Sequence, residues 1–507
     1  MRIVTADEAA ALVPDGATVV PGGFGCCGNP EAVLAALGRR FRETGHPRRL
    51  NLLFAAGPGD RGERGLNHLA QEGLVSRAIG GFWGFAPKLG RMAQENAFEA
   101  HNWPQGVMSH LFRAIAAGLP GILSRVGLET FVDPSQTGGR MNARAEAGLV
   151  QKLTMKDKTY LFFPAMPVHV AVIRGTRCDR DGNIAMDREV SYQDSLAQAQ
   201  AAHNSGGVVI AQVAEISGQP IAPHGVSVPG CLVDYVVVAE PDEHWQTWAE
   251  PFNPAYVQAG DGAPESEDGA ASPAVRRIIA RRAARELARH PGAIVNLGIG
   301  IPAEVGAAAA ELGVDDFTLT VESGQFGGVP ATGLSFGASA HPKAKIDQAS
   351  LFDLYDGGGI DLAFLGFAEA DSSGNVNVSR FQGRMPGIGG FANISGAAKR
   401  VVFCGSFTAD GLEIAIGGGR LQIQRDGSIR KFVRRLETIS FNGPLAEREG
   451  RRVTFVTERA VFELVGGCLR LTEIAPGVDL DRDIVARLDA AIVVGDEVAP
   501  MDPALFA

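Results

Sequence analysis

The sequence predicts an α/β protein with two topologically similar open α/β domains and mostly parallel sheets. Two observations point to this fold class. Short β-branched or apolar runs alternate with Ala- and Leu-rich stretches along the 507 residues, which is the pattern of strands and helices in α/β folds. In addition, the two halves of the chain resemble each other, which indicates an internal duplication.

Each half opens with the same order of elements. Residues 18–20 are a predicted strand followed by a helix over 30–37, and residues 294–297 are a strand followed by a helix over 302–312. A glycine-rich turn separates each strand from its helix. A proline opens each helix, where a missing N–H is tolerated.

The duplication is visible in two pairs of segments. Residues 16–33 (GATVVPGGFGCCGNPEAV) parallel residues 292–305 (GAIVNLGIGIPAEV), and residues 168–183 align without gaps to 360–375, with a DxxGN turn in both. The first copy is longer, so we expect an insertion between about residues 50 and 160. Two such lobes facing one another place a ligand cleft between them.

An acidic, small-residue segment separates the halves. Residues 258–273 read QAGDGAPESEDGAASP, without a large apolar residue, as an exposed linker does. We therefore expect an N-terminal domain over 1–257 and a C-terminal domain over 274–507. The helical run after the linker carries six arginines, which either form a solvated basic face or contact phosphate.

Composition and charge disfavour several classes of protein. The formal net charge of −10 disfavours nonspecific binding to nucleic acid or to an anionic membrane. The six cysteines form no CxxC pair and the ten histidines no HxxxH spacing, so we expect neither a metal site nor a disulfide framework. The N-terminal residues do not have the pattern of a signal peptide, and no apolar run reaches membrane-spanning length, so we expect neither a signal peptide nor a membrane span. We expect a cytoplasmic protein.

Glycine-rich loops are the first candidates for a binding site. In the loop over 21–30, PGGFGCCGNP, the N–H groups of Gly23 and Gly25 could hold an anion; alternatively, the glycines only permit tight βα packing. The loop lacks the GxGxxG and GK[ST] fingerprints, which disfavours NAD and ATP. A second loop, over 387–390, is either an oxyanion site or an ordinary turn.

Glu322 is the candidate catalytic residue. A predicted strand over 317–321 runs directly into it, and Ser323 and glycines at 324, 327 and 328 follow. A carboxylate at the carboxyl end of a parallel strand, with little bulk beyond it, is accessible to a substrate. The alternative is a carboxylate that only caps the next turn. Cys26 and Cys27 have no basic partner nearby in the sequence, so they are weaker candidates.

Three motifs resemble the family I CoA-transferases. They are ESGQFGGVPATGLSFGAS from Glu322, FDLYDGGGIDLAFLGFAEADSSGNVNVSRF from Phe352 and GIGGFANISGAAKRVVFCGSF from Gly387. WPQG over 103–106, the first glycine loop and LTEIAPGVDLDRDI near the C-terminus also fit. The resemblance covers essentially the whole chain and is greatest to the fused-chain acetate/propionate and 3-ketoacid enzymes. ESG and FAN differ from the succinyl-CoA:3-ketoacid branch, which argues against its dicarboxylate specificity.

The resemblance implies roles for named residues. It makes Glu322 the covalent nucleophile and places Gln105 close to the reacting carboxyl group. It assigns binding of the acyl or oxyanion oxygen to the amides of Gly389 and Gly390. We also expect substrate contacts at Gly23 and Gly25, and CoA contacts at Gly324, Gly327, Gly328 and Asn393. The family fold is two α/β domains with the active site between them.

The implied reaction transfers CoA from a short-chain acyl-CoA to a free carboxylic acid of the acetate, propionate, butyrate or 3-ketoacid class. It proceeds by ping-pong kinetics through an acyl-glutamyl anhydride and a glutamyl-CoA thioester. One thioester replaces another, so we expect no cofactor; CoA and acyl-CoA are substrates. Two alternatives stay open: an acyl-CoA hydrolase, and a non-catalytic metabolite-binding protein with this fold.

The family implies a homo-oligomer, either a dimer or a tetramer. Candidates for the acyl pocket are Phe24, Phe82, Trp83 and Phe391.

Overall fold

The structure is a computed structural model that describes residues 1–260 and 273–507. The chain packs as two compact units. Unit 1 comprises Met1–Pro264, Val321–Asp353 and Met385–Asn393, and unit 2 comprises Glu265–Thr320, Leu354–Arg384 and Ile394–Ala507. Two segments of the second half thus pack in unit 1, unlike the expected division into 1–257 and 274–507. Of the expected linker, residues 261–272 lie outside the described residues.

The core of unit 1 is an 8-stranded sheet in the order β1-β14-β12-β9-β2-β3-β4-β5. Every neighbouring pair in it is parallel. Its strands are β1 (Arg2–Ile3), β2 (Thr18–Pro21), β3 (Leu50–Ala56), β4 (Val75–Phe82), β5 (Glu99–Asn102), β9 (Val170–Arg174), β12 (Val208–Val213) and β14 (Tyr235–Val238). The central strands β2 and β9 are buried throughout, as expected of a parallel sheet covered on both faces.

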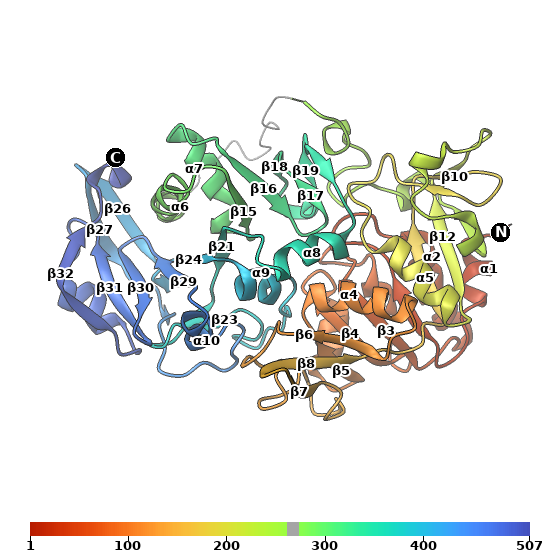
Figure 1. The fold of residues 1–507 in the computed structure, drawn as a ribbon, viewed down its shortest axis with the longest axis horizontal. Helices are drawn as coiled ribbons and strands as arrows, with labels where there is room; N and C mark the ends of the chain where they lie inside the picture. The colour runs from red at the N-terminus through yellow and green to blue at the C-terminus, as the bar shows by residue number, and fades with distance from the viewer. Residues whose placement is uncertain (261–272) are drawn as a thin grey trace. The chain divides into compact units, whose positions relative to one another are not determined.

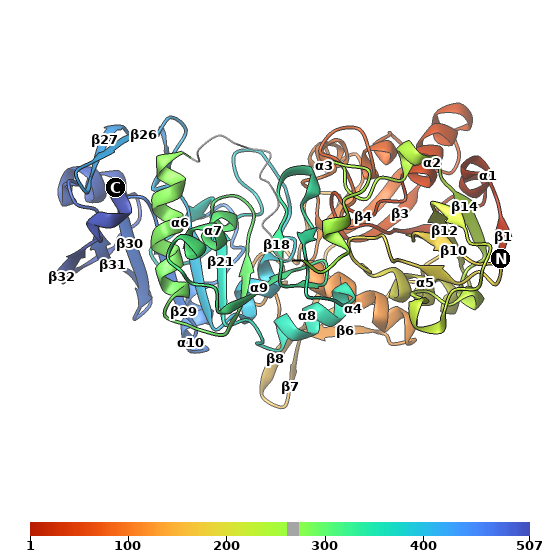
Figure 2. The same ribbon diagram turned by 90° about the horizontal axis from the view of Figure 1, so that it is seen from above.

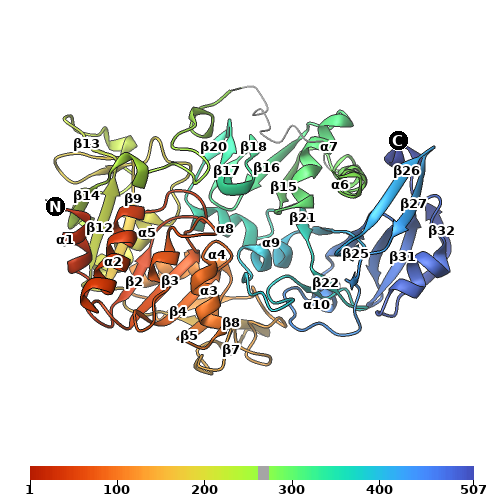
Figure 3. The same cartoon turned by 180° about the vertical axis from the view of Figure 1, so that it is seen from behind.

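Helices cover both faces of this sheet. Seen from opposite sides, α4 and α5 lie next to each other on one face, and α1 and α2 lie on the other (Figures 1 and 3). The helices of unit 1 are α1 (Ala6–Ala11), α2 (Glu31–Thr44), α3 (Pro87–Gln94), α4 (Gln105–Ala116) and α5 (Ser195–Asn204), and α8 (Gln348–Asp356) begins in it. Val33 and Leu37 of α2 pack with Val19 and Leu52 of the sheet.

Smaller sheets and hairpins complete unit 1. The antiparallel strands β6 (Gly121–Ser124), β8 (Lys158–Pro164) and β7 (Gln151–Met155) form one sheet, whose β7–β8 hairpin projects from the unit (Figure 2). The others are β10 (Arg177–Cys178) with β11 (Ile184–Ala185) and β13 (Glu215–Ile216), β17 (Gln325–Phe326) with β20 (Ala344–Lys345), and β18 (Val329–Pro330) with β19 (Ser339–Ala340).

In unit 2 the strands follow the order β16-β15-β21-β24-β29-β30-β31-β32. They are parallel as far as β29, and β30 then continues antiparallel. Their bounds are β15 (Ala293–Leu297), β16 (Phe317–Val321), β21 (Leu362–Gly366), β24 (Arg400–Cys404), β29 (Arg452–Val456), β30 (Ala460–Val465), β31 (Cys468–Ile474) and β32 (Val493–Pro500).

Helices and short hairpins surround the sheet of unit 2. The helices are α6 (Ala274–Leu287), α7 (Val305–Glu311), α9 (Phe391–Ala397) and α10 (Gly443–Arg448). The hairpins and pairs are β22 (Glu369–Ala370) with β23 (Val376–Asn377), β25 (Thr408–Ala409) with β28 (Ile429–Arg430), and β26 (Glu413–Gly417) with β27 (Arg420–Arg425). Helices α6 and α7 lie together (Figure 2) and share one apolar cluster with strand residues such as Val295 and Phe364.

The arginines of α6 are largely engaged in ion pairs within unit 2. Arg282 is buried and pairs with Glu473 at 2.6 Å and Glu286 at 2.8 Å. Arg285 pairs with Asp502 at 2.7 Å. These contacts favour a structural basic face over a phosphate-contacting helix.

The two units repeat one topology, which confirms the predicted fold class. The order β14-β12-β9-β2-β3 in unit 1 corresponds to β29-β24-β21-β15-β16 in unit 2. The two DxxGN turns have the same hydrogen bonds: Asp179 accepts from the N–H of Asn183 at 3.0 Å, and Asp371 accepts from the N–H of Asn375 at 3.0 Å. Between β3 and β9, unit 1 carries β4 to β8 with α3 and α4, in the part of the chain where we expect an insertion.

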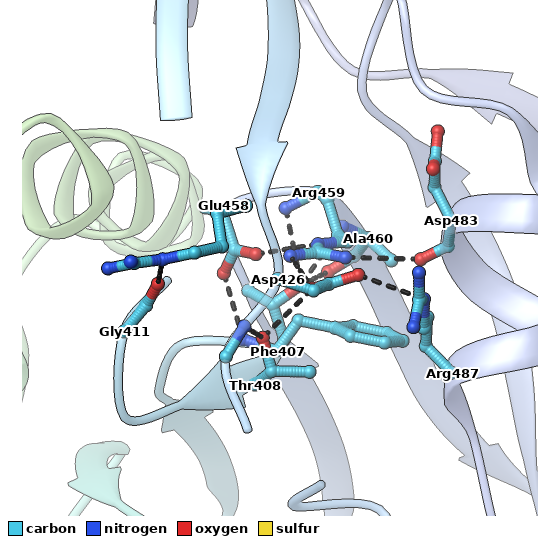
Figure 4. A network of polar contacts seen from close by, with 12 residues as sticks. Phe407, Thr408, Gly411, Asp426, Glu458, Arg459, Ala460, Asp483 and Arg487 are labelled. Carbon is cyan, nitrogen blue, oxygen red and sulfur yellow. Dashed lines mark hydrogen bonds and ion pairs between the residues drawn. The ribbon is translucent and has the colours of Figure 1, made fainter. Parts of the chain in front are cut away.

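Unit 2 also contains a buried cluster of charges (Figure 4). The side chains of Glu458 and Arg459 have no accessible surface and pair at 2.7 Å, while Arg459 also pairs with Asp426 at 2.8 Å. Glu458 accepts from the N–H of Phe407 at 2.8 Å, and Arg487 pairs with Asp426 at 3.0 Å. Each buried charge therefore has an opposite partner, which is the condition for its burial.

Candidate active site

Glu322 follows β16 directly and belongs to unit 1. The next side chain fixes the turn, because Ser323 Oγ donates to the carbonyl oxygen of Gly337 at 2.6 Å. The Glu322 residue keeps some accessible surface, yet the protein around the carboxyl group removes enough water to raise its pKa to about 7. At neutral pH a substantial fraction of this carboxyl group is ionised.

The Glu322 carboxylate lies against Gly390. A Cβ built on Gly390 would stand 3.1 Å from Oε1 of Glu322 and 3.3 Å from its Cδ, so any side chain there would crowd the carboxylate. The N–H of Gly390 has no hydrogen-bond partner in the described part of the chain. It is thus a donor next to the carboxylate that the protein leaves unused.

A backbone clamp holds this part of the loop in place. The N–H of Ile388 donates to Asn102 Oδ1 at 2.8 Å. The N–H of Gly389 donates to the carbonyl oxygen of Gly81 at 2.9 Å, and the Gly389 carbonyl accepts from the N–H of Gln105 at 2.9 Å. The Gly389 amide is therefore occupied, which argues against its predicted role as an oxyanion donor and leaves Gly390 as the candidate.

Gln105 begins α4 and is buried. Its backbone bonds Gly389, while Glu322 lies against the next residue, Gly390. Gln105 and Glu322 therefore contact two consecutive residues, Gly389 and Gly390 respectively. Gln105 Nε2 donates to Gln348 Oε1 at 3.4 Å, so the Gln105 side chain also belongs to a buried polar chain.

The glycine loop over 21–30 does not present the expected row of free amides. The N–H of Gly23 donates to Gln193 Oε1 at 2.9 Å, and that of Gly25 donates to the carbonyl oxygen of Ala56 at 3.2 Å. A Cβ on Gly25 would approach the Phe85 ring to 2.7 Å. Their close neighbours favour the alternative of tight packing, and substrate contacts at Gly23 and Gly25 stay a prediction.

The four predicted CoA contacts have packing roles. A Cβ would come within 2.0 Å of the Ile346 carbonyl oxygen at Gly324, 2.2 Å of the Ala340 carbonyl oxygen at Gly328, and 2.9 Å of Lys343 at Gly327. Asn393 is fully buried, and its Oδ1 accepts from the N–H of Gly106 at 3.1 Å. This burial argues against a CoA contact at Asn393, and contacts at the three glycines stay a prediction.

Of the aromatic candidates for an acyl pocket, Phe82 is the one best placed. It is partly exposed, and a Cβ on Gly389 would lie 3.3 Å from its ring. Phe24 and Trp83 are buried. Phe391 is partly exposed at the start of α9.

The adjacent cysteines are buried and lack the environment of a nucleophile. Burial raises the pKa of Cys26 to about 12 and that of Cys27 well above its ordinary value. The Cys27 thiol donates to the carbonyl oxygen of Phe336 at 3.2 Å.

Within residues 1–260 and 273–507, His, Cys, Asp and Glu side chains form no group of three or more placed to hold a metal ion. Among the same residues, none of the helices combines the length and apolar character needed to span a bilayer.

A cavity of about 230 Å³ lies elsewhere in unit 1, at the carboxyl ends of β9, β12 and β14. Its lining includes the buried pair Arg174–Glu189, at 3.0 Å, and His244, but none of the residues predicted for the site. Burial and the Arg174 charge lower the pKa of His244.

Three buried residues of the polar chain that includes Gln105 stand in no sequence motif: Ser109, Asp194 and Gln348. Ser109 could have been found, because it lies four residues after Gln105 on the same helix face. Asp194 and Gln348 are distant in sequence from Gln105 and from each other, and neither stands in a recognisable pattern. Only the fold shows that they are neighbours.

Comparison with known proteins identifies the family. The family model described as Coenzyme A transferase matches residues 3–239. The chain is 41% identical over 508 residues to acetate CoA-transferase YdiF of Escherichia coli O157:H7, covering 99% of this chain and 95% of that protein. It is 42% identical over 514 residues to caffeate CoA-transferase of Acetobacterium woodii, covering 100% and 97%. A crystal structure of acyl-CoA transferase YdiF from E. coli O157:H7, as a thioester complex with CoA, has a TM-score of 0.93 at 40% identity and covers 100% of this chain and 96% of that one. The chain therefore belongs to the coenzyme A transferase family and is a CoA-transferase.

Proposed function

We propose that this CoA-transferase moves CoA from a short-chain acyl-CoA to a free carboxylic acid of the acetate, propionate, butyrate or 3-ketoacid class, with Glu322 as the covalent nucleophile. The observation that carries the proposal is the partly exposed Glu322 carboxylate, which lies against Gly390 with an unused N–H beside it. Relatives similar over the full chain are named acetate and caffeate CoA-transferases, which supports carboxylic acids as acceptors.

The reaction is written as two exchanges at carbonyl groups. A Glu322 carboxylate oxygen attacks the thioester carbonyl carbon, the C–S bond breaks and CoA thiolate leaves, which forms an acyl-glutamyl anhydride. The thiolate then attacks the glutamyl carbonyl carbon and expels the first acid, leaving a glutamyl-CoA thioester. The acceptor carboxylate reverses both steps and departs as the new acyl-CoA. Charge and atoms balance without a proton donor.

Each attack develops negative charge on a carbonyl oxygen. The N–H of Gly390, whose Cα carries the built Cβ that lies 3.1 Å from Glu322 Oε1, is our candidate donor to this carbonyl oxygen. Loss of one such donor costs about 3 kcal/mol in comparable sites. The hydrogen bonds of Ile388 and Gly389 hold the loop, so this donor needs little reorganisation during the reaction.

Desolvation serves the same chemistry. Burial raises the pKa of Glu322 to about 7, which makes its carboxylate more basic than a solvated one and hence a better nucleophile. A site with little water also protects the anhydride and the thioester from hydrolysis.

Intact mass spectrometry tests the nucleophile. The protein is mixed with propionyl-CoA without an acceptor acid and reduced with borohydride. We expect a modification that maps to Glu322, is absent in Glu322→Ala and is strongly reduced in Glu322→Asp, because the shorter side chain moves the oxygen by about 1 Å. An unmodified wild type with bound propionyl-CoA would refute the covalent mechanism.

A second assay separates transfer from hydrolysis. Labelled acetate and propionyl-CoA are incubated with the enzyme, and labelled acetyl-CoA and free CoA are quantified. Labelled acetyl-CoA formed in step with propionate release supports the transferase reaction with short-chain acids. Free CoA without label in acetyl-CoA contradicts acetate as an acceptor and indicates hydrolysis.

Cofactor independence, assembly and location belong to the same proposal. Because one thioester replaces another, we propose that no metal or cofactor is needed, and activity after dialysis against EDTA tests this. We further propose a cytoplasmic homo-oligomer, either a dimer or a tetramer. Sedimentation velocity distinguishes these states from a monomer, and cell fractionation tests the location.

A further inference from the structure

A buried chain of polar side chains leads from Gln105 into the interior of unit 1. Gln105 Nε2 donates to Gln348 Oε1 at 3.4 Å. Gln348 Nε2 donates to Asp194 Oδ2 at 2.6 Å and contacts Ser109 Oγ at 2.6 Å. Ser109 Oγ in turn donates to Asp194 Oδ2 at 3.0 Å. All four side chains are buried, so water does not compete with these contacts.

The chain fixes which way each amide faces. Asp194 Oδ2 accepts, so the Gln348 group facing it must be the NH₂ donor. The other end of the Gln348 amide is then the carbonyl oxygen, and it faces Gln105. Gln105 must therefore present its own NH₂ to Gln348, which defines the orientation of the Gln105 amide.

Three different elements supply this chain. Gln105 and Ser109 lie on α4, Gln348 begins α8, and Asp194 precedes α5. The preceding residue, Gln193, has a φ of 53°, an uncommon conformation for a residue other than glycine. Its carbonyl oxygen accepts from the N–H of Gln348 at 3.0 Å, which places the start of α8 next to Asp194.

Burying the Asp194 carboxyl group away from water costs free energy. No arginine or lysine pairs with it at salt-bridge distance within the described residues, and its Oδ1 has no hydrogen-bond partner there. Desolvation raises the pKa of Asp194 to about 7, with the Asp347 charge adding to the effect and Arg113 opposing it. A buried carboxyl group of this kind is a candidate for a functional role.

We propose that Asp194 and Gln348 are positioning residues that hold the Gln105 amide in its reactive orientation. The inference rests on the proposed function and on the place close to the reacting carboxyl group that the family resemblance predicts for Gln105. Neither residue is proposed to touch the substrate. Their contribution reaches the reaction through Gln105 alone, which makes the proposal separable from a general role in stability.

The first test compares two glutamine-to-methionine variants. Gln348→Met keeps the volume but removes both the donor and the acceptor. Gln212→Met is the matched control, since Gln212 is equally buried and hydrogen-bonded, to the N–H of Ala32 and the carbonyl oxygen of Glu243. We expect Gln348→Met to lower kcat at least tenfold, because misplacing a group at a reaction centre by about 1 Å costs up to about a hundredfold. KM for acyl-CoA should change less than kcat, and Gln212→Met should lose thermal stability without losing kcat.

A double-mutant cycle provides the decisive readout. If Gln348 acts through Gln105, then Gln348→Met should change kcat by less than about twofold in a Gln105→Ala background. The same fold loss in both backgrounds would overturn the proposal. Asp194→Asn should stay within about threefold of the wild-type kcat, because its carbonyl oxygen replaces the acceptor Oδ2. A loss as large as that of Gln348→Met would contradict the role of Asp194 as an acceptor.

Failure of this inference is distinguishable from failure of the proposed function. If the wild type forms the Glu322 adduct and Gln348→Met forms it at the same rate, only the positioning role is wrong. If the wild type forms no adduct, the covalent mechanism itself is wrong.

Discussion

Gly390→Ala tests how closely the reaction depends on the position of the Glu322 carboxylate. The added Cβ would lie 3.1 Å from Oε1 and 3.3 Å from both Cδ and Cγ of Glu322. An ordinary van der Waals contact begins near 3.4 Å, so the carboxylate must move by about 0.3 Å. Gly390 is not among the residues with a positive φ, so alanine is compatible with its backbone.

The size of the effect follows from this shift. A misplacement of 1 Å lowers the rate of an enzymatic step by about 100-fold. If the logarithm of the rate falls in proportion to the displacement, a shift of about 0.3 Å gives a loss of roughly fourfold. The new methyl group also takes room beside the carboxylate that the acyl carbon needs during attack. We therefore expect kcat to fall between fourfold and 100-fold with little change in melting temperature.

The assay is steady-state transfer of CoA from propionyl-CoA to acetate, with the rate of Glu322 adduct formation measured in parallel. Gly396→Ala is the matched control, because it lies in α9 with nothing within 4 Å of its built Cβ. It should leave kcat unchanged and keep or slightly raise the stability, as alanine is the better helix former. Full activity of Gly390→Ala would refute the placement of the reacting carboxylate against Gly390.

Other predictions concern ionisation, buried charge and thiol reactivity. Because burial raises the pKa of Glu322 to about 7, kcat/KM should fall about tenfold per pH unit below pH 7, measured in Asp194→Asn so that Asp194 does not titrate. The raised pKa means that the fold favours the neutral carboxyl group, and this stability is lost as pH rises from the unfolded pKa through 7. The melting temperature of Glu322→Gln should therefore exceed that of the wild type by more at pH 8 than at pH 5; an equal difference would contradict the pKa. Arg459→Ala leaves Glu458 buried without its partner, so urea unfolding should show a loss of about 3–5 kcal/mol, and a loss below 1 kcal/mol would show that the cluster relaxes. Iodoacetamide at pH 8 should alkylate the exposed Cys231 but not the buried Cys26, with activity retained; peptide mass mapping checks this, and labelled Cys26 would show that its burial is incomplete.

The fold class followed from features that act locally. Alternating strand and helix patterns, two glycine turns and two DxxGN turns are sufficient for a duplicated α/β topology, because parallel strands joined by helices have few alternative arrangements. The hydrogen bonds of Asp179 and Asp371 confirm that the two turns are equivalent. The assignment of segments to the two packed units could not be predicted from these local patterns. Residues 321–353 and 385–393 join unit 1 through contacts with distant parts of the chain.

The candidate site was predictable only in part. Glu322 stands out because a strand precedes it and small residues follow it. The Gly389 N–H donates a hydrogen bond to Gly81, whereas the Gly390 N–H makes none in the described part of the chain. This difference could not be predicted, because Gly81 is far away in sequence. The glycines at 23 and 324 are required by close backbone or side-chain neighbours. Sequence marks such positions but does not distinguish close packing from ligand contact.

The polar chain in unit 1 also has a consequence for synthesis of the protein on the ribosome. Gln105 and Gln348 are 243 residues apart, and at about 5–20 residues per second the ribosome needs roughly 10–50 s to make the intervening chain. During this interval the polar face of α4 has neither its partner from α8 nor the Glu322 segment. With Glu322 and Gln105 in the proposed roles, a growing chain therefore carries no complete reaction centre until most of it has been made.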